Sequence, residues 1–281
     1  MNLKKKLVAA TIMAMSLAMV AGCGGKTEKK AEAPKAAEKK ILRIATNATY
    51  VPFEFKDNTA QGKDSDYKGI EIDMVREVAK RLGMETKMSN IPFNGIIPAI
   101  LSKDVDMAAT GMTMTKERAK KVAFAAPFYE SKLCIVVPKN STVKSAADLK
   151  GKRVAAMVGT TGAKYGQANG MDIKQFDTSA DALLEMQTGN AVAAVVDKPV
   201  GEYYGAIEGK GKGKVNVITI PDSKSELLGF VMSKDNKDLQ TKVNKALADM
   251  KKDGTYNKIY KKWFNVDAPN LPETAEKALG L

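Results

Sequence analysis

The sequence predicts an α/β protein whose sheets contain parallel strand pairs. Short apolar runs that suit buried strands, such as 41–45, 105–109 and 191–196, alternate with segments whose apolar residues recur at helical spacing. This alternation is typical of strand–helix–strand units rather than of all-helical or all-β folds. It extends over about 225 residues, from 41 to 266, a length that allows two small lobes.

The first half of this region reads as strand, helix, helix and strand. Strand 41–45 ends in a loop, and a helix follows with apolar residues at helical spacing up to Leu82. Gly83 is a natural helix stop. A second helix, 96–101, carries isoleucine and leucine on one side and leads to the strand 105–109.

The pattern repeats in the second half, again with a tight turn between strand and helix. An apolar strand at 153–158 is followed by the turn 159–162 and by a helix from Ala163. Helix 181–188 then leads to strand 191–196. Further segments are predicted as a flexible loop at 209–214, helices at 239–250 and 256–264, and a helix-like tail at 272–279; the Trp263 and Phe264 pair is interpreted as core packing.

The amino terminus has the pattern of a lipoprotein signal peptide over residues 1–22. Lys4–Lys6 form a positive segment, and Leu7–Val20 is apolar but too short for a membrane anchor. Small residues then precede Cys23, which cleavage would leave as a lipidated first residue. Two acyl chains would anchor the protein stably. The alternative is an ordinary secretory signal followed by an incidental cysteine.

Residues 23–40 should form the lipidated cysteine and a disordered tether. After Cys23 they are mostly lysine, glutamate, alanine and proline, without aromatic or large aliphatic side chains that could be buried. The formal net charge is +13, part of which lies in this segment and in the signal peptide. The remaining basic residues are scattered, which argues against nucleic-acid binding and favours an anionic envelope surface.

The residue types that are missing exclude several kinds of chemistry. The chain has no histidine, which removes the commonest general base, most zinc sites and the usual catalytic triads. Apart from Cys23, the only cysteine is Cys134, inside the apolar run 132–138, where a lone thiol is expected to pack in the core. We therefore expect neither a metal nor a cofactor.

The stretch Thr110–Arg118 suits the binding of a small zwitterion. It combines a glycine, three threonines and a guanidinium, and Thr115 is placed to cap a helix in which Arg118 is the third residue. Arg118 could then donate two N–H bonds to a carboxylate, with Thr113 and the helix start beside it. The alternative is a capped helix whose arginine only pairs with neighbouring surface charges.

Six short motifs follow one another in a characteristic order: Tyr50–Phe55, Phe93–Ala99, Thr110–Arg118, Gly159–Gly162, Val196–Asp197 and Gly254–Phe264. In this order they resemble the polar amino acid-binding proteins of ABC importers, solute-binding family 3. The resemblance implies a two-lobe periplasmic-binding-protein-like fold of type II with two crossover hinge strands, near 128–131 and 227–230. Lobe 1 would comprise 41–129 and 229–264, lobe 2 would comprise 130–228, and 265–281 would be a tail.

The resemblance also implies which residues hold the amino acid backbone. Arg118 matches the arginine that clamps the α-carboxylate, assisted by Thr113 and by the backbone and hydroxyls of Thr160 and Thr161. For the α-ammonium, Gly111 would offer its carbonyl and Asp197 its carboxylate. An aspartate directly after a strand is otherwise most often a helix cap.

The ligand's side chain would lie among a second group of residues. Tyr50 and Phe93 match aromatic walls, with core packing as the alternative, and Asn47 and Met157 match the side-chain end; Thr110 completes the predicted lining. Family members for basic amino acids, and also a glutamine-binding member, tend to carry an acid where this chain has Asn47, and the glutamine type has a lysine at the position of Met157. Without an acid at position 47 a buried basic side chain would lose its partner, so a neutral polar ligand such as glutamine is favoured. A binder of arginine, lysine or histidine remains the alternative if Asp66 or Glu71 reaches the pocket.

The resulting functional prediction is an extracytoplasmic solute-binding lipoprotein and not an enzyme. It would capture a polar amino acid as a monomer at the outer face of the cytoplasmic membrane, and deliver it to the transmembrane subunits of an ABC permease. A dehydratase on the same scaffold would need a pocket acid with a raised pKa. A sensory input domain would need a membrane helix after Phe264, where 17 residues follow.

Overall fold

The computed structural model of the chain describes residues 40–56, 62–207 and 211–281. Cys23, the predicted signal peptide and the tether up to residue 39 lie outside these residues, as does part of the predicted loop 209–214. The described residues belong to one compact unit. Within them, no helix has both the length and the apolar character that a membrane span requires.

The first of two five-stranded sheets has the order β5-β1-β6-β15-β7. Strand β1 is parallel to β5 and to β6, whereas β15 is antiparallel to β6 and β7. Because β15 follows β7 by more than a hundred residues, the chain leaves this sheet and returns to it. The strands are β1 (Lys40–Thr46), β5 (Met84–Asn90), β6 (Met107–Ala108), β7 (Ala123–Phe124) and β15 (Val231–Met232).

The excursion builds the second sheet, of order β11-β10-β12-β9-β13. Strand β10 is parallel to β11 and β12, and β9 is antiparallel to β12 and β13. The strands are β9 (Leu133–Pro138), β10 (Arg153–Met157), β11 (Asp172–Phe176), β12 (Ala193–Asp197) and β13 (Val215–Thr219). We call the structures around the first and second sheets lobe 1 and lobe 2.

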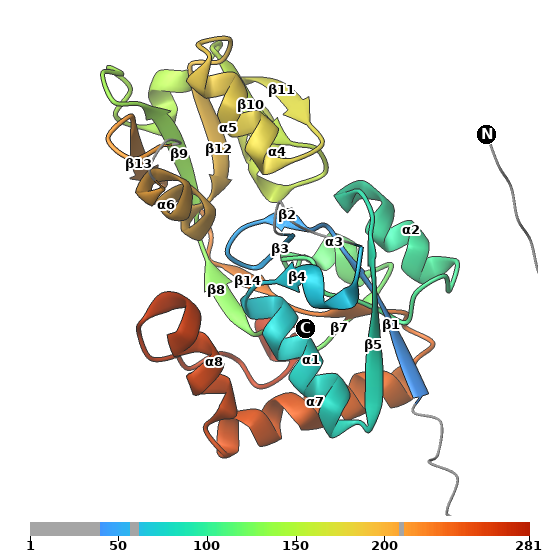
Figure 1. The fold of residues 1–281 in the computed structure, drawn as a ribbon. Helices are drawn as coiled ribbons and strands as arrows, with labels where there is room; N and C mark the ends of the chain where they lie inside the picture. The colour runs from blue at the N-terminus through green and yellow to red at the C-terminus, as the bar shows by residue number, and fades with distance from the viewer. Residues whose placement is uncertain (1–39, 57–61, 208–210) are drawn as a thin grey trace, which may run out of the picture. The chain divides into compact units, whose positions relative to one another are not determined.

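Two short strands connect the lobes at the places where crossovers were predicted. β8 (Tyr129–Ser131) and β14 (Glu226–Leu228) pair antiparallel, and Figure 1 shows them side by side between the two sheets. A further small sheet in lobe 1 consists of β2 (Thr49–Tyr50), β3 (Glu54–Lys56) and β4 (Tyr67–Lys68). The structure thus has the two-lobe α/β fold of type II periplasmic binding proteins.

Helices cover both sheets. In lobe 1, α1 packs on β5 and on α7 and α8, and in lobe 2, α5 and α4 pack on β10 while α6 packs on β9 and β13. The α-helices are α1 (Ile70–Arg81), α2 (Ile96–Leu101), α3 (Lys116–Ala119), α4 (Thr161–Ala168), α5 (Ser179–Gln187), α6 (Lys198–Ala206), α7 (Lys237–Lys252), α8 (Thr255–Phe264) and α9 (Ala275–Leu279), and the 3-10 turns are η1 (Asp64–Asp66), η2 (Phe93–Gly95) and η3 (Ala146–Leu149).

Where an element was predicted, the observed one agrees to within about two residues at its ends, except that α9 is shorter than the helix predicted at 272–279. Strands β5, β11 and β13 and helix α6 were not predicted, so the first half has a strand between its two helices that the sequence reading missed. Helix α1 ends before Gly83, whose φ of 67° is left-handed. Strand β6 is shorter than the predicted 105–109: only Met107 and Ala108 pair in register with β1, although the backbone N–H groups of Asp106 and Ala109 still donate to carbonyls of β1.

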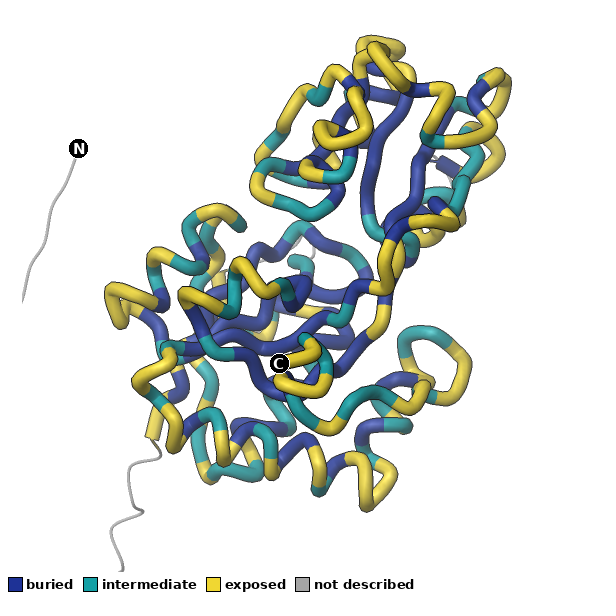
Figure 2. The backbone as a smooth tube through the Cα atoms, turned by 180° about the vertical axis from the view of Figure 1, so that it is seen from behind, coloured by how far each residue is buried: buried dark blue, intermediate teal, exposed yellow. Residues whose placement is uncertain are grey.

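The central strands of both sheets are buried, as Figure 2 shows by their dark blue colour. The Cys134 thiol is fully buried in β9, as expected for a packing residue. Trp263 and Phe264 also pack in the core, and the Trp263 indole donates to Asp73. The predicted tail helix contributes Ala275, which is buried against the cluster that contains Phe124.

Candidate ligand-binding site

One cavity between the lobes brings together all of the predicted ligand-contact residues. Lobe 1 and lobe 2 both line it, and Glu54 joins the predicted set. The void that they leave is about 20 Å³, room for about one water molecule, so an amino acid enters only after the lining residues move apart. The lining residues are Asn47, Tyr50, Glu54, Phe93, Thr110, Gly111, Thr113, Arg118, Met157, Thr160, Thr161 and Asp197.

Gly111 has to be glycine at this place. Its φ is 55°, and a Cβ atom would lie 2.6 Å from Cε1 of Tyr50. Because Gly111 has no side chain, the Tyr50 ring can lie against the backbone of the turn. The Tyr50 ring also stacks on the Phe53 ring, and the two ring centroids are 5.2 Å apart. Burial, and then the nearby Asp197 carboxylate, raise the pKa of the Tyr50 hydroxyl, which donates to Asp197.

Arg118 lies where the turn and the cap were predicted to place it. Thr115 accepts a hydrogen bond from the Arg118 backbone N–H at 3.1 Å, so the cap is confirmed. The guanidinium donates to the carbonyl of Thr113 at 2.7 Å and, across the lobes, to the carbonyl of Gly159 at 3.0 Å. Among the described residues no carboxylate forms an ion pair with it, so its charge is available to an incoming carboxylate. Burial lowers the pKa of this guanidinium.

The threonine hydroxyls have partners that the sequence did not indicate. Thr113 donates to Glu226 at 3.3 Å, and Thr161 donates to the same oxygen at 3.0 Å. Thr160 donates to the carbonyl of Met157 and accepts from the N–H of Ala163, as the N-cap of α4. These hydroxyls are therefore engaged within the protein, and Thr160 and Thr161 place the start of α4 at the cavity.

Asp197 forms a carboxyl pair with Glu226. Asp197 occupies the N-cap position of α6 but makes no side-chain cap bond, so the helix-cap alternative is wrong. Instead it accepts from Tyr50 and from Ser131, and it is hydrogen-bonded to Glu226. Burial, and then Asp197, raise the pKa of Glu226 to about 8. Two carboxyl groups in contact share a proton, because both cannot ionise without a cation.

Glu54 and Glu71 form a second carboxyl pair behind the turn. Glu71 accepts from the backbone N–H groups of Thr110 and Gly111 at 2.9 and 2.6 Å, and burial raises its pKa to about 7. Glu54 is fully buried, no N–H or hydroxyl group in the described part of the chain donates to it, and burial and Glu71 raise its pKa well above its usual value. The raised pKa values of both carboxyl groups favour a proton held between them, and Glu54 lines the cavity.

The remaining predicted residues form the rest of the wall. The Phe93 ring stacks beneath the Arg118 guanidinium, 5.4 Å from ring centroid to carbon. The Asn47 side chain is hydrogen-bonded within lobe 1, since its amide donates to the carbonyl of Ile91 and accepts from Thr49. Thr110 accepts from the backbone N–H of Asn47 at 3.2 Å. Met157 is buried and accepts from Ser179 through its sulfur.

Of the two acids that were considered for the pocket, neither lines it. Glu71 lies behind Thr110 and Gly111, with its oxygens on their N–H groups. Asp66 lies in η1, where it accepts from the backbone N–H of Lys63, and is also outside the lining. Sequence reasoning missed Glu54, which lines the cavity, and Glu226, which lies behind the lining residues Thr113 and Thr161. Glu54 stands between Phe53 and Phe55 in a short strand, a signal that indicates a buried carboxylate, whereas Glu226 follows Ser225 and carries no such signal.

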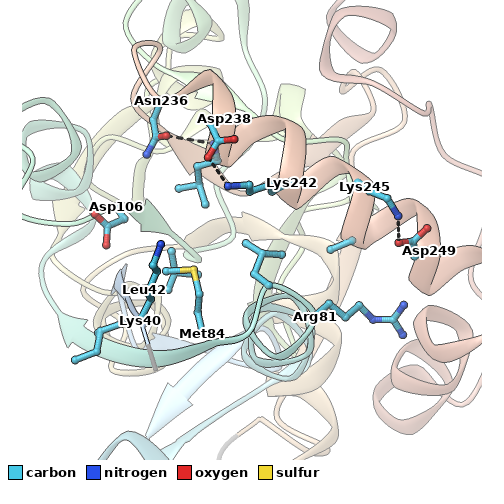
Figure 3. Close-up of a pocket in the computed structure, with 14 residues that line it drawn as sticks. Lys40, Leu42, Arg81, Met84, Asp106, Asn236, Asp238, Lys242, Lys245 and Asp249 are labelled. Atoms are coloured by element: carbon cyan, nitrogen blue, oxygen red, sulfur yellow. Dashed lines mark hydrogen bonds and ion pairs between the residues drawn. The ribbon is translucent and has the colours of Figure 1, made fainter. Parts of the chain in front are cut away.

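A larger cavity lies elsewhere and lacks such a convergence. It has a volume of about 860 Å³ and lies between β1, α1 and α7 (Figure 3). Its two lysines in α7 pair with acids of the same helix, Lys242 with Asp238 and Lys245 with Asp249. Over residues 40–56, 62–207 and 211–281, no cluster of cysteine, aspartate and glutamate suits a metal ion.

Residues 42–266 match the family described as bacterial extracellular solute-binding proteins, family 3. The chain belongs to this family. Among the relatives of this family 3 protein is ABC transporter arginine-binding protein 1 of Escherichia coli strain K12. The two are 33% identical over 231 residues, which cover 82% of this chain and 92% of the relative.

Two solved structures of an ancestral arginine-binding protein are similar to this family 3 protein, each with a TM-score of 0.74 and 38% identity. One is bound to glutamine; the match covers 81% of this chain and 99% of that one. The other is bound to arginine, and the match covers 80% of this chain and 99% of that one. Both of these relatives are described as binding proteins and neither as an enzyme, in agreement with the expected function class.

Proposed function

We propose that this family 3 protein captures a basic L-amino acid, arginine before lysine or histidine, outside the cytoplasm for an ABC importer. The E. coli relative is named as the arginine-binding protein of an ABC transporter, and the ancestral protein is also named for arginine. This proposal replaces glutamine, which the neutral Asn47 favoured. The premise of that preference was a pocket without an acid near the side chain, and Glu54 removes it.

The observation that carries the proposal is the excess of carboxyl groups around one guanidinium. The pairs Asp197–Glu226 and Glu54–Glu71 each keep one negative charge even when each shares a proton, and Arg118 cancels one of the two. The site is thus negative overall. A neutral amino acid leaves that charge uncompensated in a buried place, whereas a cationic side chain offsets one negative charge more, whether or not a carboxyl pair loses its proton on binding.

The geometry supports one orientation of the ligand. Its α-carboxylate would meet Arg118 and the first N–H groups of α4, beginning at Thr161. Its α-ammonium would meet Asp197 and the carbonyl of Gly111. The side chain would then extend between Tyr50 and Phe93 toward Glu54, with Asn47, Thr110 and Met157 around it. The hydroxyls of Thr113, Thr160 and Thr161 would support this arrangement through the bonds described above.

Binding requires the lobes to separate and close, because the present void admits only a water molecule. We propose that the two lobes move as two bodies about β8 and β14. Lobe 1 then consists of residues 41–129 and 229–264, lobe 2 consists of residues 130–228, and the tail 265–281 remains on lobe 1. The two hinge strands are paired by three residues each, so small backbone changes in them are sufficient for a large relative movement.

A ligand screen tests this function. The purified protein is melted with each of the twenty amino acids at equal concentration, and hits are titrated by calorimetry. A ligand present at a hundred times its dissociation constant stabilises by about 2.7 kcal/mol. We expect arginine to give the largest stabilisation, followed by the other basic amino acids. If no amino acid stabilises the protein, the proposed function is wrong.

We also propose that Cys23 carries lipid and anchors the protein at the outer face of the cytoplasmic membrane. The motif that ends at Cys23 supports this, and the relatives do not address it. In fractionated cells, Cys23→Ala should remain unprocessed at this site and lose its acyl chains, which metabolic labelling with palmitate detects. A variant that is labelled and pellets with membranes as the parent does would contradict the proposal.

A dehydratase on this scaffold is the second candidate, because Glu226, which accepts from the cavity residues Thr113 and Thr161, is an acid with a raised pKa. One similar structure, 38% identical with a TM-score of 0.72, is an ancestral amino acid-binding protein described as a precursor of cyclohexadienyl dehydratase. That ancestor is itself named as a binding protein, which favours binding here. Incubation with cyclic diene carboxylates and detection of aromatic product distinguishes the two functions.

A further inference from the structure

Glu226 lies at the one place where the hinge, both lobes and the ligand site meet. It belongs to the hinge strand β14, opposite Ser131 of β8, and is 9% exposed. A hydroxyl from each lobe donates to its Oε2 atom, Thr113 from lobe 1 and Thr161 from lobe 2. It is also hydrogen-bonded to Asp197, the residue expected to hold the α-ammonium. No sequence motif assigned a role to it.

The surroundings of Glu226 leave it short of positive charge. The charged or titratable groups that face it are Arg118 from α3, Tyr50 from β2 and Asp197 from the end of β12. Arg118 is directed to the carbonyls of Thr113 and Gly159 rather than to Glu226. A buried carboxyl pair without a cation of its own has to retain a proton, and an arriving ammonium removes the need for it.

We propose that Glu226 is a second carboxyl group of the α-ammonium site, and that binding of an amino acid expels the proton that Glu226 shares with Asp197. The proposal rests on the proposed amino acid-binding function. Before binding, the pair holds one proton and one negative charge. After binding, both carboxylates are ionised around the ammonium, and the proton has passed to solvent.

The pH dependence of affinity follows from linkage. The pKa of Glu226 in the free protein is raised to about 8, so the pair keeps its proton below that pH and has to release it on binding. Ligand affinity should therefore rise with pH by up to about tenfold per unit between about pH 6 and 8, and level off above. The same effect is expected for every α-amino acid that binds, because all carry the α-ammonium.

The experiment measures proton release directly. The protein is titrated with L-arginine at pH 7 in buffers of different ionisation enthalpy, and affinities are collected from pH 6 to 8.5. Glu226→Gln keeps the shape of the side chain and an oxygen for the hydroxyls of Thr113 and Thr161, but carries no proton that titrates. Glu54→Gln is the control for proton release from the other carboxyl pair.

We expect release of close to one proton per ligand from the Asp197–Glu226 pair, present in Glu54→Gln and lost in Glu226→Gln. The two affinity curves of parent and Glu226→Gln should converge near pH 6 and differ by about tenfold or more at pH 8. Proton release that persists in Glu226→Gln, or arginine binding without any proton exchange, overturns the proposal and leaves the binding function intact. A protein that binds no amino acid refutes the proposed function instead.

Discussion

Replacing Arg118 by alanine should remove the main anchor of the ligand's carboxylate. In the structure this guanidinium makes hydrogen bonds to two backbone carbonyls and no ion pair among the described residues, so its charge is free for the ligand. Without it, the carboxylate would be buried beside an acid-rich wall with no charged partner. The expected loss is about 3–5 kcal/mol, or about two to four decades of affinity.

Arg118 also bridges the lobes through Gly159, and the assay has to separate that contribution from the clamp. Calorimetric titration of parent and Arg118→Ala with arginine and with its decarboxylated amine does so. Loss of the bridge weakens both ligands equally, whereas loss of the clamp weakens arginine alone. Arg118→Lys should recover part of the affinity, because lysine restores the charge without the two-pronged geometry.

A matched control is available in lobe 2. Arg153 is exposed and pairs with the exposed Asp172, so Arg153→Ala removes the same charge far from the cavity and should leave binding unchanged. Arginine affinity of Arg118→Ala within threefold of the parent would exclude Arg118 from the site, and the orientation proposed for the ligand would have to be abandoned.

Two other substitutions test the wall of the pocket. Glu54→Gln should weaken the binding of arginine by about tenfold and change the binding of glutamine little, because arginine loses a charge-assisted bond worth about 1.5–3 kcal/mol, partly offset by the proton that Glu54 shares with Glu71. Calorimetry measures both ligands, with the exposed Glu276→Gln as the control. Equal effects on the two ligands would refute a contact between Glu54 and the ligand's side chain. Gly111→Ala should displace the Tyr50 ring, lower the free energy of unfolding by about 1–3 kcal/mol and remove most of the ligand affinity. The control is Gly83→Ala, because Gly83 has a similar φ but open space around it, and this variant should bind normally in the same titration. Unimpaired binding by Gly111→Ala would show that the turn tolerates a side chain.

The sequence predicts the backbone of the site because local rules decide it. Thr115 caps α3 and Gly83 ends α1 through interactions within a few residues, so each is visible in the order of amino acids. Helix α3, however, has only four residues, so its dipole contributes little to anion binding, contrary to the expectation for this turn. The length of a helix depends on how it packs, which the local pattern does not contain.

The premise of the predicted ligand preference is weakened for a tertiary reason. It treated position 47 as the place that decides charge, but the amide of Asn47 is held by Ile91 and Thr49 of its own lobe. Asn47→Asp would place a carboxylate against the carbonyl of Ile91, so the substitution is not a clean gain of a ligand contact. The relevant acids come from β3 and from the hinge strand β14. Glu54 lines the cavity and Glu226 contacts the lining residues Thr113 and Thr161 only because the small sheet and the hinge fold toward the site, and the local order of residues does not indicate this.

The ratio of arginine to glutamine affinity tests the central claim most directly. Both ligands share the α-carboxylate and α-ammonium, and their side chains differ in charge, so the ratio isolates the effect of the acid-rich wall. Competition calorimetry at pH 7 on the purified protein should give arginine the tighter binding by at least about tenfold. Glutamine binding as tightly as arginine, or more tightly, would contradict the account and restore the neutral polar ligand.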